Sequence, residues 1–328
     1  MSLNLKSLVN GLRAIVITDD KVHSLYGHLF EGLDVVVIPQ GDINKNLDTA
    51  KYVYQRLLEL EADRTCFLIG FGGGVVLDMT GFTASTFIRG LKFGFVPTTL
   101  LAQADAAYGG KNGVNFEGTK NIVGLIAKPE FIYSDSPFLK TLDDKELKCG
   151  LVEIIKMALV ADQELFRYLE IEKQKILNLD KEIIEEVIKR GVKIKMDMVS
   201  VDEFDNGERR KLNFGHTLGH ALEDLSDGLL SHGEAVSEGI MFAIKVSVSL
   251  GHLKAEEAER IEQAFWSYGI KTGSEIKKYR TQEIMNSVVK DKKRADNAIN
   301  FVFLEAVGQA FILSTPITKL EELINDLR

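Results

Sequence analysis

The chain is poor in the residues that mark several common classes of protein. Its 328 residues include two cysteines, Cys66 and Cys149, five prolines and a single tryptophan. Two isolated cysteines make neither a disulfide framework nor a Cys-x-x-Cys site, which fits a reducing compartment. No apolar run approaches the roughly 20 residues that span a bilayer, and the amino-terminal residues lack a signal-peptide pattern. These absences favour a cytoplasmic protein with no membrane partner.

Positive charge is also scarce. The 40 Lys and Arg residues are outnumbered by 48 Asp and Glu residues, which gives a net charge of −8. A nucleic-acid-binding protein needs a basic face, so we expect no nucleic-acid partner. An anionic small substrate stays compatible with this balance, because Lys and Arg can cluster locally in an acidic protein.

The order of the predicted elements indicates an α/β fold with two domains. Predicted strands at 13–18, 34–38, 65–69 and 92–96 alternate with helices at 21–30, 47–62 and 75–86. Near-continuous apolar strands separated by helices are typical of a parallel sheet covered on both faces. After about residue 139 the pattern is mostly helical, at 143–160, 163–169, 181–199, 218–225, 234–250, 254–268 and 281–289, with a possible hairpin at 299–303 and 309–313. We therefore predict a parallel-sheet domain over 1–145 and a mostly helical domain over 146–328.

Three of the six histidines lie close together in the sequence. His216 and His220 are four residues apart, so a helix would place both on one face. A turn at Asp227-Gly228 could return His232 to the same place. Paired imidazoles can ligate a divalent metal or share ligand and acid–base roles. The alternative is that these are ordinary surface or core histidines.

A glycine-rich stretch, Gly70 to Gly74, joins a predicted strand to a predicted helix. This arrangement lets backbone N–H groups and the helix N-terminus meet a phosphate. The G-x-G-x-x-G fingerprint does not fit, because Val75 occupies its last position. The stretch indicates either a variant nucleotide-binding loop or a tight strand-to-helix turn.

Two further groups of residues suit an anionic ligand. Lys111 follows two glycines, and Lys120 with Asn121 comes shortly after, although a glycine-rich surface loop explains them equally well. Glu153 and Lys156 share one face of an otherwise apolar helix. Such pairs are usually solvated, but a carboxylate plus two imidazoles is a common catalytic zinc set.

Together these motifs resemble the 3-dehydroquinate synthase family of sugar-phosphate cyclases, from about Asp19 to Lys293. The pieces that carry the resemblance are 72–78, 89–90, 97–103, 109–111, 118–121, 153–156, 213–220 and 232–234. It implies a Rossmann-like NAD-binding domain, a helical metal- and substrate-binding domain and a homodimer. The implied reaction converts 3-deoxy-D-arabino-heptulosonate 7-phosphate, an anionic phosphosugar, to 3-dehydroquinate and phosphate. NAD is recycled within each turnover, Zn2+ or Co2+ is required, and an intramolecular aldol closure completes the product.

The resemblance also implies a role for individual residues. The metal ligands would be Glu153, His216 and His232. The catalytic residues would be His220, Asp205, Lys156, Arg209 and Asn213. The substrate would contact Asp105, Lys111, Asn121, Lys195 and Lys292, with Arg89 reaching across from the partner subunit. NAD would contact Asp19, Asp42, Lys45, Gly73, Gly74, Val75, Asp78, Thr98, Thr99, Lys120 and Thr141.

Several positions depart from the family pattern. Asp205 and Asp42 stand where the family has Glu. The other departures are Lys21 for Asn, Leu77 for Gly, Asn112 for Thr, and Cys149 for Ser or Asn. None removes a ligand or a phosphate-binding cation, so the implied activity is kept. Three alternatives stay open. They are a cyclase for glucose 6-phosphate, sedoheptulose 7-phosphate or an amino analogue, a metal-dependent polyol or alcohol dehydrogenase, and a non-enzymatic phosphosugar-binding protein.

Overall fold

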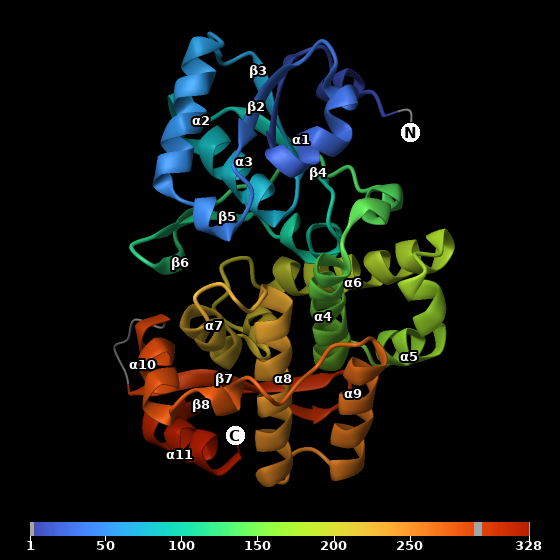
Figure 1. Ribbon diagram of the computed structural model, residues 1–328, viewed down its shortest axis with the longest axis vertical. Coiled ribbons are helices and arrows are strands. Elements are labelled where there is room, and N and C mark those ends of the chain that lie inside the picture. Colours follow the sequence, from blue (N-terminus) through green and yellow to red (C-terminus); the bar gives the residue numbers. More distant parts are fainter. Residues whose placement is uncertain (1–2, 292–296, 328) are drawn as a thin grey trace. The chain divides into compact units, whose positions relative to one another are not determined.

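The computed structural model describes residues 3–291 and 297–327, and the chain forms two compact units, Met1–Leu139 and Lys140–Arg328 (Figure 1). The predicted fold class is confirmed, since the first unit holds a parallel sheet and the second is mostly helical. In the described part of the chain, no helix combines the length and the apolar character that crossing a membrane requires.

The first unit is built on a four-stranded parallel sheet with the order β2-β1-β3-β4. Its strands are β1 (Arg13–Asp19), β2 (Asp34–Ile38), β3 (Cys66–Gly72) and β4 (Lys92–Pro97). Leu68 on β3 pairs with Ile15 on β1 and with Phe93 on β4. Every residue of β3 is buried, in agreement with its sequence, which contains no polar side chain that would need solvent.

Helices cover both faces of this sheet (Figure 1). One face packs Ile15, Ile17 and Leu68 against α2 (Leu47–Glu59) and α3 (Gly74–Thr86). The other packs Val16 and Phe71 against α1 (Asp20–Tyr26) and the short turns η1 (Leu5–Val9) and η2 (Gly27–Phe30). Because successive side chains of a strand point to opposite faces, β1 contributes to both cores.

The glycine-rich stretch after β4 folds into a hairpin that the sequence analysis did not assign. It consists of β5 (Lys111–Phe116) and β6 (Thr119–Ile126), and a π-helical turn, η5 (Ala102–Ala106), precedes it. The buried Asn112 side chain donates to the carbonyls of Gly110 (2.8 Å) and Ala127 (2.9 Å) and ties the base of the hairpin together. Short turns at η3 (Asp42–Asn44), η4 (Phe87–Arg89) and η6 (Ser136–Thr141) complete the connections.

The second unit contains the predicted helices and one that was not predicted. They are α4 (Asp144–Ala161), α5 (Gln163–Leu177), α6 (Lys181–Val201), α7 (His216–Leu225), α8 (His232–Ser249), α9 (Ala255–Ser267), α10 (Thr281–Asp291) and the unpredicted α11 (Ile317–Leu327), with turns η7 (Glu208–Asn213) and η8 (Ile276–Lys278). The central helix α8 is buried along most of its length and packs against α4, α7 and α9.

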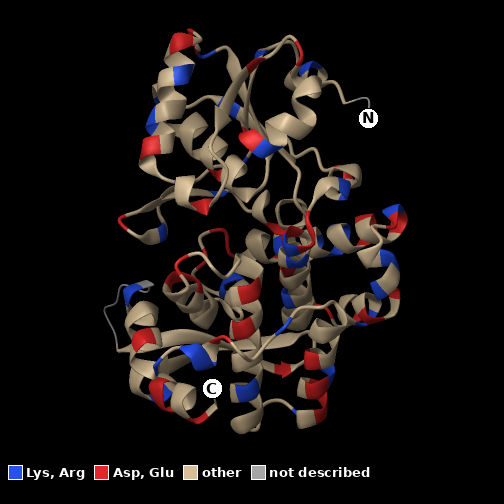
Figure 2. Ribbon diagram, in the orientation of Figure 1, with Lys and Arg blue, Asp and Glu red and all other residues tan. Residues whose placement is uncertain are grey.

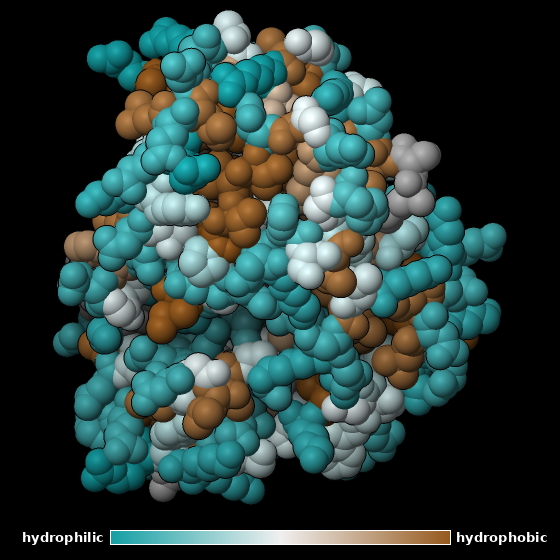
Figure 3. Space-filling model, turned by 45° about the horizontal axis from the view of Figure 1, so that its top comes forward, coloured by the Kyte–Doolittle hydropathy of each residue, from teal (hydrophilic) through white to brown (hydrophobic). Residues whose placement is uncertain are grey.

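The predicted hairpin of the second unit is confirmed as β7 (Ala298–Ala306) and β8 (Gln309–Pro316), which pair antiparallel. Acidic and basic residues are interspersed along the outer helices of this unit (Figure 2). A group of hydrophobic residues reaches the surface on the upper part of the face in Figure 3, with hydrophilic residues around it.

Candidate metal centre and nucleotide-binding loop

Close packing of α7 on α8 positions the histidines of the second unit. Gly215, at φ +79°, precedes His216, and a Cβ atom there would lie 2.5 Å from the Ile240 side chain. A Cβ atom on Gly239 would lie 1.9 Å from the Gly215 carbonyl oxygen. Only glycine fits at both positions, so these glycines let the first turn of α7 lie directly against α8.

A capping box starts α8 at His232. The backbone N–H and the hydroxyl of Ser231 donate to the Glu234 carboxylate at 2.8 and 2.6 Å, and the Glu234 N–H donates back to the Ser231 hydroxyl. Lys145 on α4 forms an ion pair with Glu234 at 3.2 Å. Glu234 therefore fixes where His232 begins its helix and ties that end to α4.

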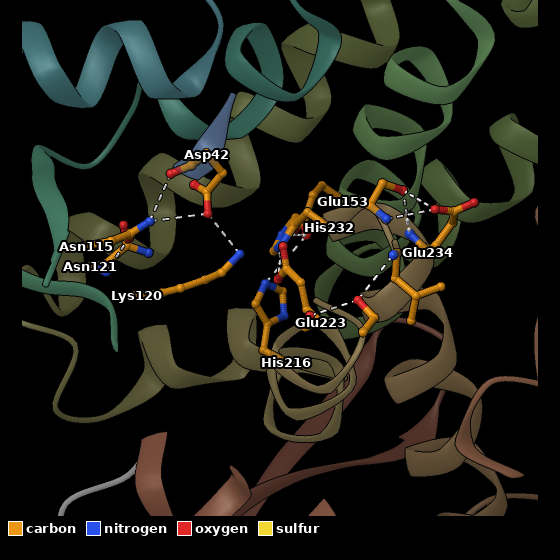
Figure 4. Close-up of polar contacts among 12 residues, drawn as sticks. Asp42, Asn115, Lys120, Asn121, Glu153, His216, Glu223, His232 and Glu234 are labelled. Atoms are coloured by element: carbon orange, nitrogen blue, oxygen red, sulfur yellow. Dashed lines mark hydrogen bonds and ion pairs between the residues drawn. The ribbon is translucent and has the colours of Figure 1, made fainter. Parts of the chain in front are cut away.

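Three side chains from α4, α7 and α8 converge on one point. The Glu153 Oε1 atom lies 3.5 Å from His216 Nε2 and 3.2 Å from His232 Nε2 (Figure 4). One ligand atom from each of the three lies within 4.8 Å of the others. The turn predicted at Asp227-Gly228 has positive φ at both residues, and α8 does return His232 to the other histidines.

Glu153 and Lys156 are fully buried, so the solvated-pair explanation is wrong. Lys156 Nζ lies 2.5 Å from Glu153 Oε2, and the two residues are 2% and 1% exposed. Burial alone would raise the pKa of Glu153, but Lys156, His216 and His232 together hold that pKa well below its usual range. Burial, with Lys156 nearby, lowers the pKa of His216 well below 6.5. Burial also opposes charge on His232, yet hydrogen bonds to Glu153 and Glu223 raise its pKa to about 9.

This donor set fits a divalent metal such as zinc or cobalt. An ionised carboxylate oxygen and two imidazole nitrogens meet from three helices, and three protein ligands leave a position open for a reacting oxygen. His216 Nδ1–H donates to the Phe214 carbonyl oxygen at 3.2 Å, which leaves Nε2 as the ligating atom. His220 is outside the set, with its ring 5.2 Å from that of His216.

The other predicted residues of this unit include two buried cations. Lys195 on α6 is 8% exposed and Arg209 on η7 is 3% exposed, so neither charge is a surface charge. Asn213 ends η7, three residues before His216. Asp205 adopts φ +61°, a left-handed conformation that is uncommon outside glycine.

Asp202 organises the loop that carries Asp205 and Arg209. Its carboxylate accepts hydrogen bonds from the backbone N–H groups of Asn206 (2.9 Å), Gly207 (2.6 Å) and Arg209 (3.2 Å). These hydrogen bonds lower the pKa of Asp202. No role was predicted for Asp202, although it directly follows α6 and lies four residues before Asn206-Gly207, a common turn sequence.

In the first unit the glycine-rich loop does form the N-terminus of a helix. Gly73 is the extended N-cap of α3, and Gly74 is its first residue. Thr98 is buried and donates its N–H to the Gly72 carbonyl oxygen at 2.9 Å. A Cβ atom on Gly73 would lie 3.1 Å from the Thr99 side chain. Backbone N–H groups at such an N-terminus are free of partners within the helix and favour a phosphate.

A polar network beside this loop contains five residues predicted to bind NAD or substrate. Lys45 Nζ donates to Asn121 Oδ1 at 2.5 Å and forms an ion pair with Asp78. Lys120 Nζ lies 3.0 Å from Asp42 Oδ2, and the unpredicted Asn115 donates to the same carboxylate at 3.3 Å (Figure 4). The structure thus brings residues from β5, β6, η3 and α3 together.

Most of the remaining predicted residues of the first unit lie at the ends of its helices, strands and turns. Asp19 caps α1 through the Val22 N–H at 2.8 Å, and burial raises the pKa of its carboxyl. Beyond the carboxyl end of β2 lies a cavity of about 480 Å³, lined by Asp20, Val37, Ile38, Pro39, Asn44, Asn46, Asp48, Thr49 and Tyr52. Asp105 lies on η5, the exposed Lys111 begins β5, Val75 lies in the first turn of α3, and Arg89 adopts φ +70°. Thr141 belongs to the second unit, and Lys292 lies outside the described residues.

Comparisons with known proteins identify the family. The family model for the N-terminal region of 3-dehydroquinate synthase matches residues 35–149, and the model for its C-terminal region matches residues 150–294. The chain belongs to the 3-dehydroquinate synthase family. A 3-dehydroquinate synthase of Acetivibrio thermocellus is 42% identical over 81% of this chain and 73% of its own length. Another, of Dehalococcoides mccartyi, is 40% identical over 92% of this chain and 85% of its own length.

Solved structures of sugar-phosphate cyclases share the fold of this family member. A 2-epi-5-epi-valiolone synthase from Streptomyces hygroscopicus, with NAD+ and Zn2+ bound, matches at a TM-score of 0.89 and 25% identity, over 98% of this chain and 92% of that one. A 2-deoxy-scyllo-inosose synthase complexed with carbaglucose-6-phosphate, NAD+ and Co2+ matches at 0.84 and 22%, over 99% and 94%. A probable glycerol dehydrogenase from Sinorhizobium meliloti is more distant, at 0.68 and 15%, over 98% and 92%.

Proposed function

We propose that this chain is a 3-dehydroquinate synthase, an NAD- and metal-dependent carbon–oxygen lyase. It converts 3-deoxy-D-arabino-heptulosonate 7-phosphate to 3-dehydroquinate and phosphate. The observation that carries the proposal is 40% identity to a curated 3-dehydroquinate synthase over 92% of the chain. The convergence of Glu153, His216 and His232 supports the metal dependence.

The cofactor and the metal would be held by residues of different units. Glu153, His216 and His232 would hold Zn2+ or Co2+, while Gly73, Gly74 and the network around Lys45, Asp42 and Lys120 would hold NAD. When bound, the metal would polarise the hydroxyl that is oxidised, and NAD would accept the hydride and later return it.

The chain's own residues would bind the phosphosugar and move its protons. Lys195 and Arg209 are buried cations that can neutralise a phosphate or a carboxylate. The resemblance assigns Lys111 and Asn121 to the substrate as well. Lys156 holds Glu153 ionised at 2.5 Å. His220, whose ring lies beside that of His216, would act as the acid–base residue.

Asp205 and Asn213 would complete the substrate site. Asp205 replaces the Glu of the family pattern with a side chain one methylene shorter. The loop held by Asp202 and the φ of +61° at Asp205 set where this shorter side chain starts. By the resemblance, Asp205 would take part in proton transfer.

The active protein would be a homodimer in which Arg89 contributes to the partner's site. Three consecutive residues, Ile88, Arg89 and Gly90, have positive φ, and the value of +42° for the β-branched Ile88 is uncommon. Backbone strain of this kind persists where the surroundings require it and occurs at functional sites. The strained turn therefore supports a functional role for Arg89, which we take to be its contribution to the partner's site.

A substrate panel tests the assignment. Purified protein with NAD+ and Zn2+ should form 3-dehydroquinate from 3-deoxy-D-arabino-heptulosonate 7-phosphate, and with at least 100-fold lower kcat/KM should act on sedoheptulose 7-phosphate or glucose 6-phosphate. Both competitors are informative, because the sequence left cyclases for these two sugar phosphates open as alternatives. Preferential turnover of either competitor would replace the proposal with that cyclase activity.

A further inference from the structure

Glu223 is a carboxylate beside the candidate metal centre that none of the predicted roles uses. It lies on α7, two turns after His216 and on the same helix face. Its side chain is only 10% exposed, and its Oε2 atom lies 3.4 Å from Nδ1 of His232 on α8 (Figure 4). A buried carboxylate of this kind is costly unless it serves a partner.

The two histidines of the centre use their ring nitrogens in the same way, with Nδ1 in a hydrogen bond to the protein and Nε2 facing Glu153. His216 directs Nδ1 to the Phe214 carbonyl oxygen, and His232 directs Nδ1 to Glu223. Both rings then present Nε2 to Glu153 Oε1, at 3.5 and 3.2 Å. In a neutral imidazole the nitrogen that donates a hydrogen bond cannot ligate, so the Nδ1 partner decides which nitrogen faces the metal.

We infer that Glu223 is a positioning residue that fixes the ring orientation and the tautomer of His232, and that it thereby sets the affinity of the centre for its metal. The inference rests on the proposed function, because it takes Glu153, His216 and His232 to be the metal ligands. Glu223 is not itself a ligand, since it is absent from the set of converging ligand atoms found among the described residues. The restraint on His232 comes from a charged acceptor, whereas that on His216 comes from a neutral carbonyl, and hydrogen bonds to ionised acceptors are the stronger kind.

The adjacent residue offers a matched control. Asp224 on α7 accepts a hydrogen bond from the Ser287 hydroxyl of α10 at 3.0 Å, so it joins two helices, and its carboxylate is directed to Ser287 and not to the metal centre. Asp224→Asn changes the same charge at the next position, and it should affect packing of α10 without changing the metal centre. Glu223→Gln keeps an oxygen that can accept the Nδ1–H, while Glu223→Ala removes it.

Metal affinity, measured without substrate, tests the inference. Apoprotein is titrated with Co2+ and Zn2+ against a chromophoric chelator, and the visible absorption of bound Co2+ is recorded. We expect Glu223→Ala to bind each ion about 10- to 100-fold more weakly, with an altered Co2+ spectrum, and Glu223→Gln to lose less. Asp224→Asn should match the wild type in both measurements.

A second measurement reports the tautomer directly. In 15N-histidine-labelled apoprotein, titrated with base until the His232 ring is neutral, the wild type should show His232 protonated at Nδ1, and Glu223→Ala should show a mixture of tautomers. Wild-type affinity, spectrum and tautomer in a folded Glu223→Ala protein would overturn the inference. If the wild type binds neither ion, the metal part of the proposed function fails first and the inference falls with it. Normal metal binding with no turnover would refute the proposed reaction but leave the role of Glu223 standing.

Discussion

At the scale of single residues, the ionisation of Glu153 decides the chemistry of the second unit. The carboxylate is 1% exposed and would be neutral in apolar surroundings, but one lysine and two histidines surround it. Sequence spacing showed that Glu153 and Lys156 share a helix face. It could not show that this face is buried, because α4 is covered by distant segments of the chain, α6 and α8 among them.

Removing one histidine should remove the metal. His216→Ala leaves Glu153 and His232, and two ligands hold a divalent ion far less tightly than three. We expect less than one tenth of the wild-type zinc content after dialysis, together with loss of activity. Elemental analysis checks this, and the exposed His28 supplies a control, since His28→Ala should retain the full zinc content. Full zinc content in folded His216→Ala protein would contradict the assigned ligands.

Glu238 on α8 should make stability depend on pH. Burial raises the pKa of its carboxyl, although the Ser274 N–H donates to Oε1 at 3.2 Å, and Oε2 has no hydrogen-bond partner among the described residues. The folded state therefore holds this proton more tightly than the unfolded state does. Stability is unaffected well below the unfolded pKa, and it falls as pH rises from there through the folded pKa.

Replacing Glu238 with Gln tests that sign. The amide cannot ionise, yet it still accepts from the Ser274 N–H, so the variant should gain stability over the wild type as pH rises above about 4.5. Urea unfolding at pH 4, 6 and 8 measures the difference in free energy of unfolding. A difference that is constant over this range would show that folding does not shift the pKa of Glu238, and one that shrinks as pH rises would show that folding lowers it.

At the scale of elements, the contact between α7 and α8 leaves no room for a side chain at its glycines. Gly239→Ala would place a Cβ atom 1.9 Å from the Gly215 carbonyl oxygen, which is backbone and must move. We expect a loss of about 1–3 kcal/mol in the free energy of unfolding, with weaker metal binding because His216 follows Gly215 directly. Thermal and urea unfolding check this against Lys245→Ala, an exposed substitution on the same helix that should cost under about 0.5 kcal/mol. Equal stability of the two variants would contradict the close packing.

Whether a segment forms a helix or a strand was predictable wherever its hydrophobic residues followed one clear pattern. The apolar strands β1 to β4 and the long helices of the second unit follow from such patterns. The hairpin β5–β6 was missed because its stability comes from the buried Asn112 side chain and from glycines at 109 and 110, which read locally as a loop. The network of Lys45, Asp78 and Asn121 was likewise unpredictable as a contact, since it joins residues 76 positions apart.

At the scale of the whole molecule, the proposed homodimer makes a prediction about mixed subunits. If Arg89 completes the partner's site, Arg89→Ala and His216→Ala are each nearly inactive alone, but a hybrid dimer contains one site with neither substitution. After subunit exchange, an equimolar mixture should recover about a quarter of the wild-type activity, since half of the dimers are hybrids with one intact site. No recovery, with exchange verified by mass, would place Arg89 in the site of its own subunit.

The measurement that tests the central claim most directly records phosphate release and NADH absorbance together during turnover of 3-deoxy-D-arabino-heptulosonate 7-phosphate. A synthase that returns its hydride should release phosphate over many turnovers with no net NADH, and a metal chelator should stop the reaction. NADH that accumulates in step with substrate consumption would contradict the account, because it would make this member of the family a dehydrogenase. Phosphate release that continues unchanged after the metal is removed would contradict the metal centre of Glu153, His216 and His232.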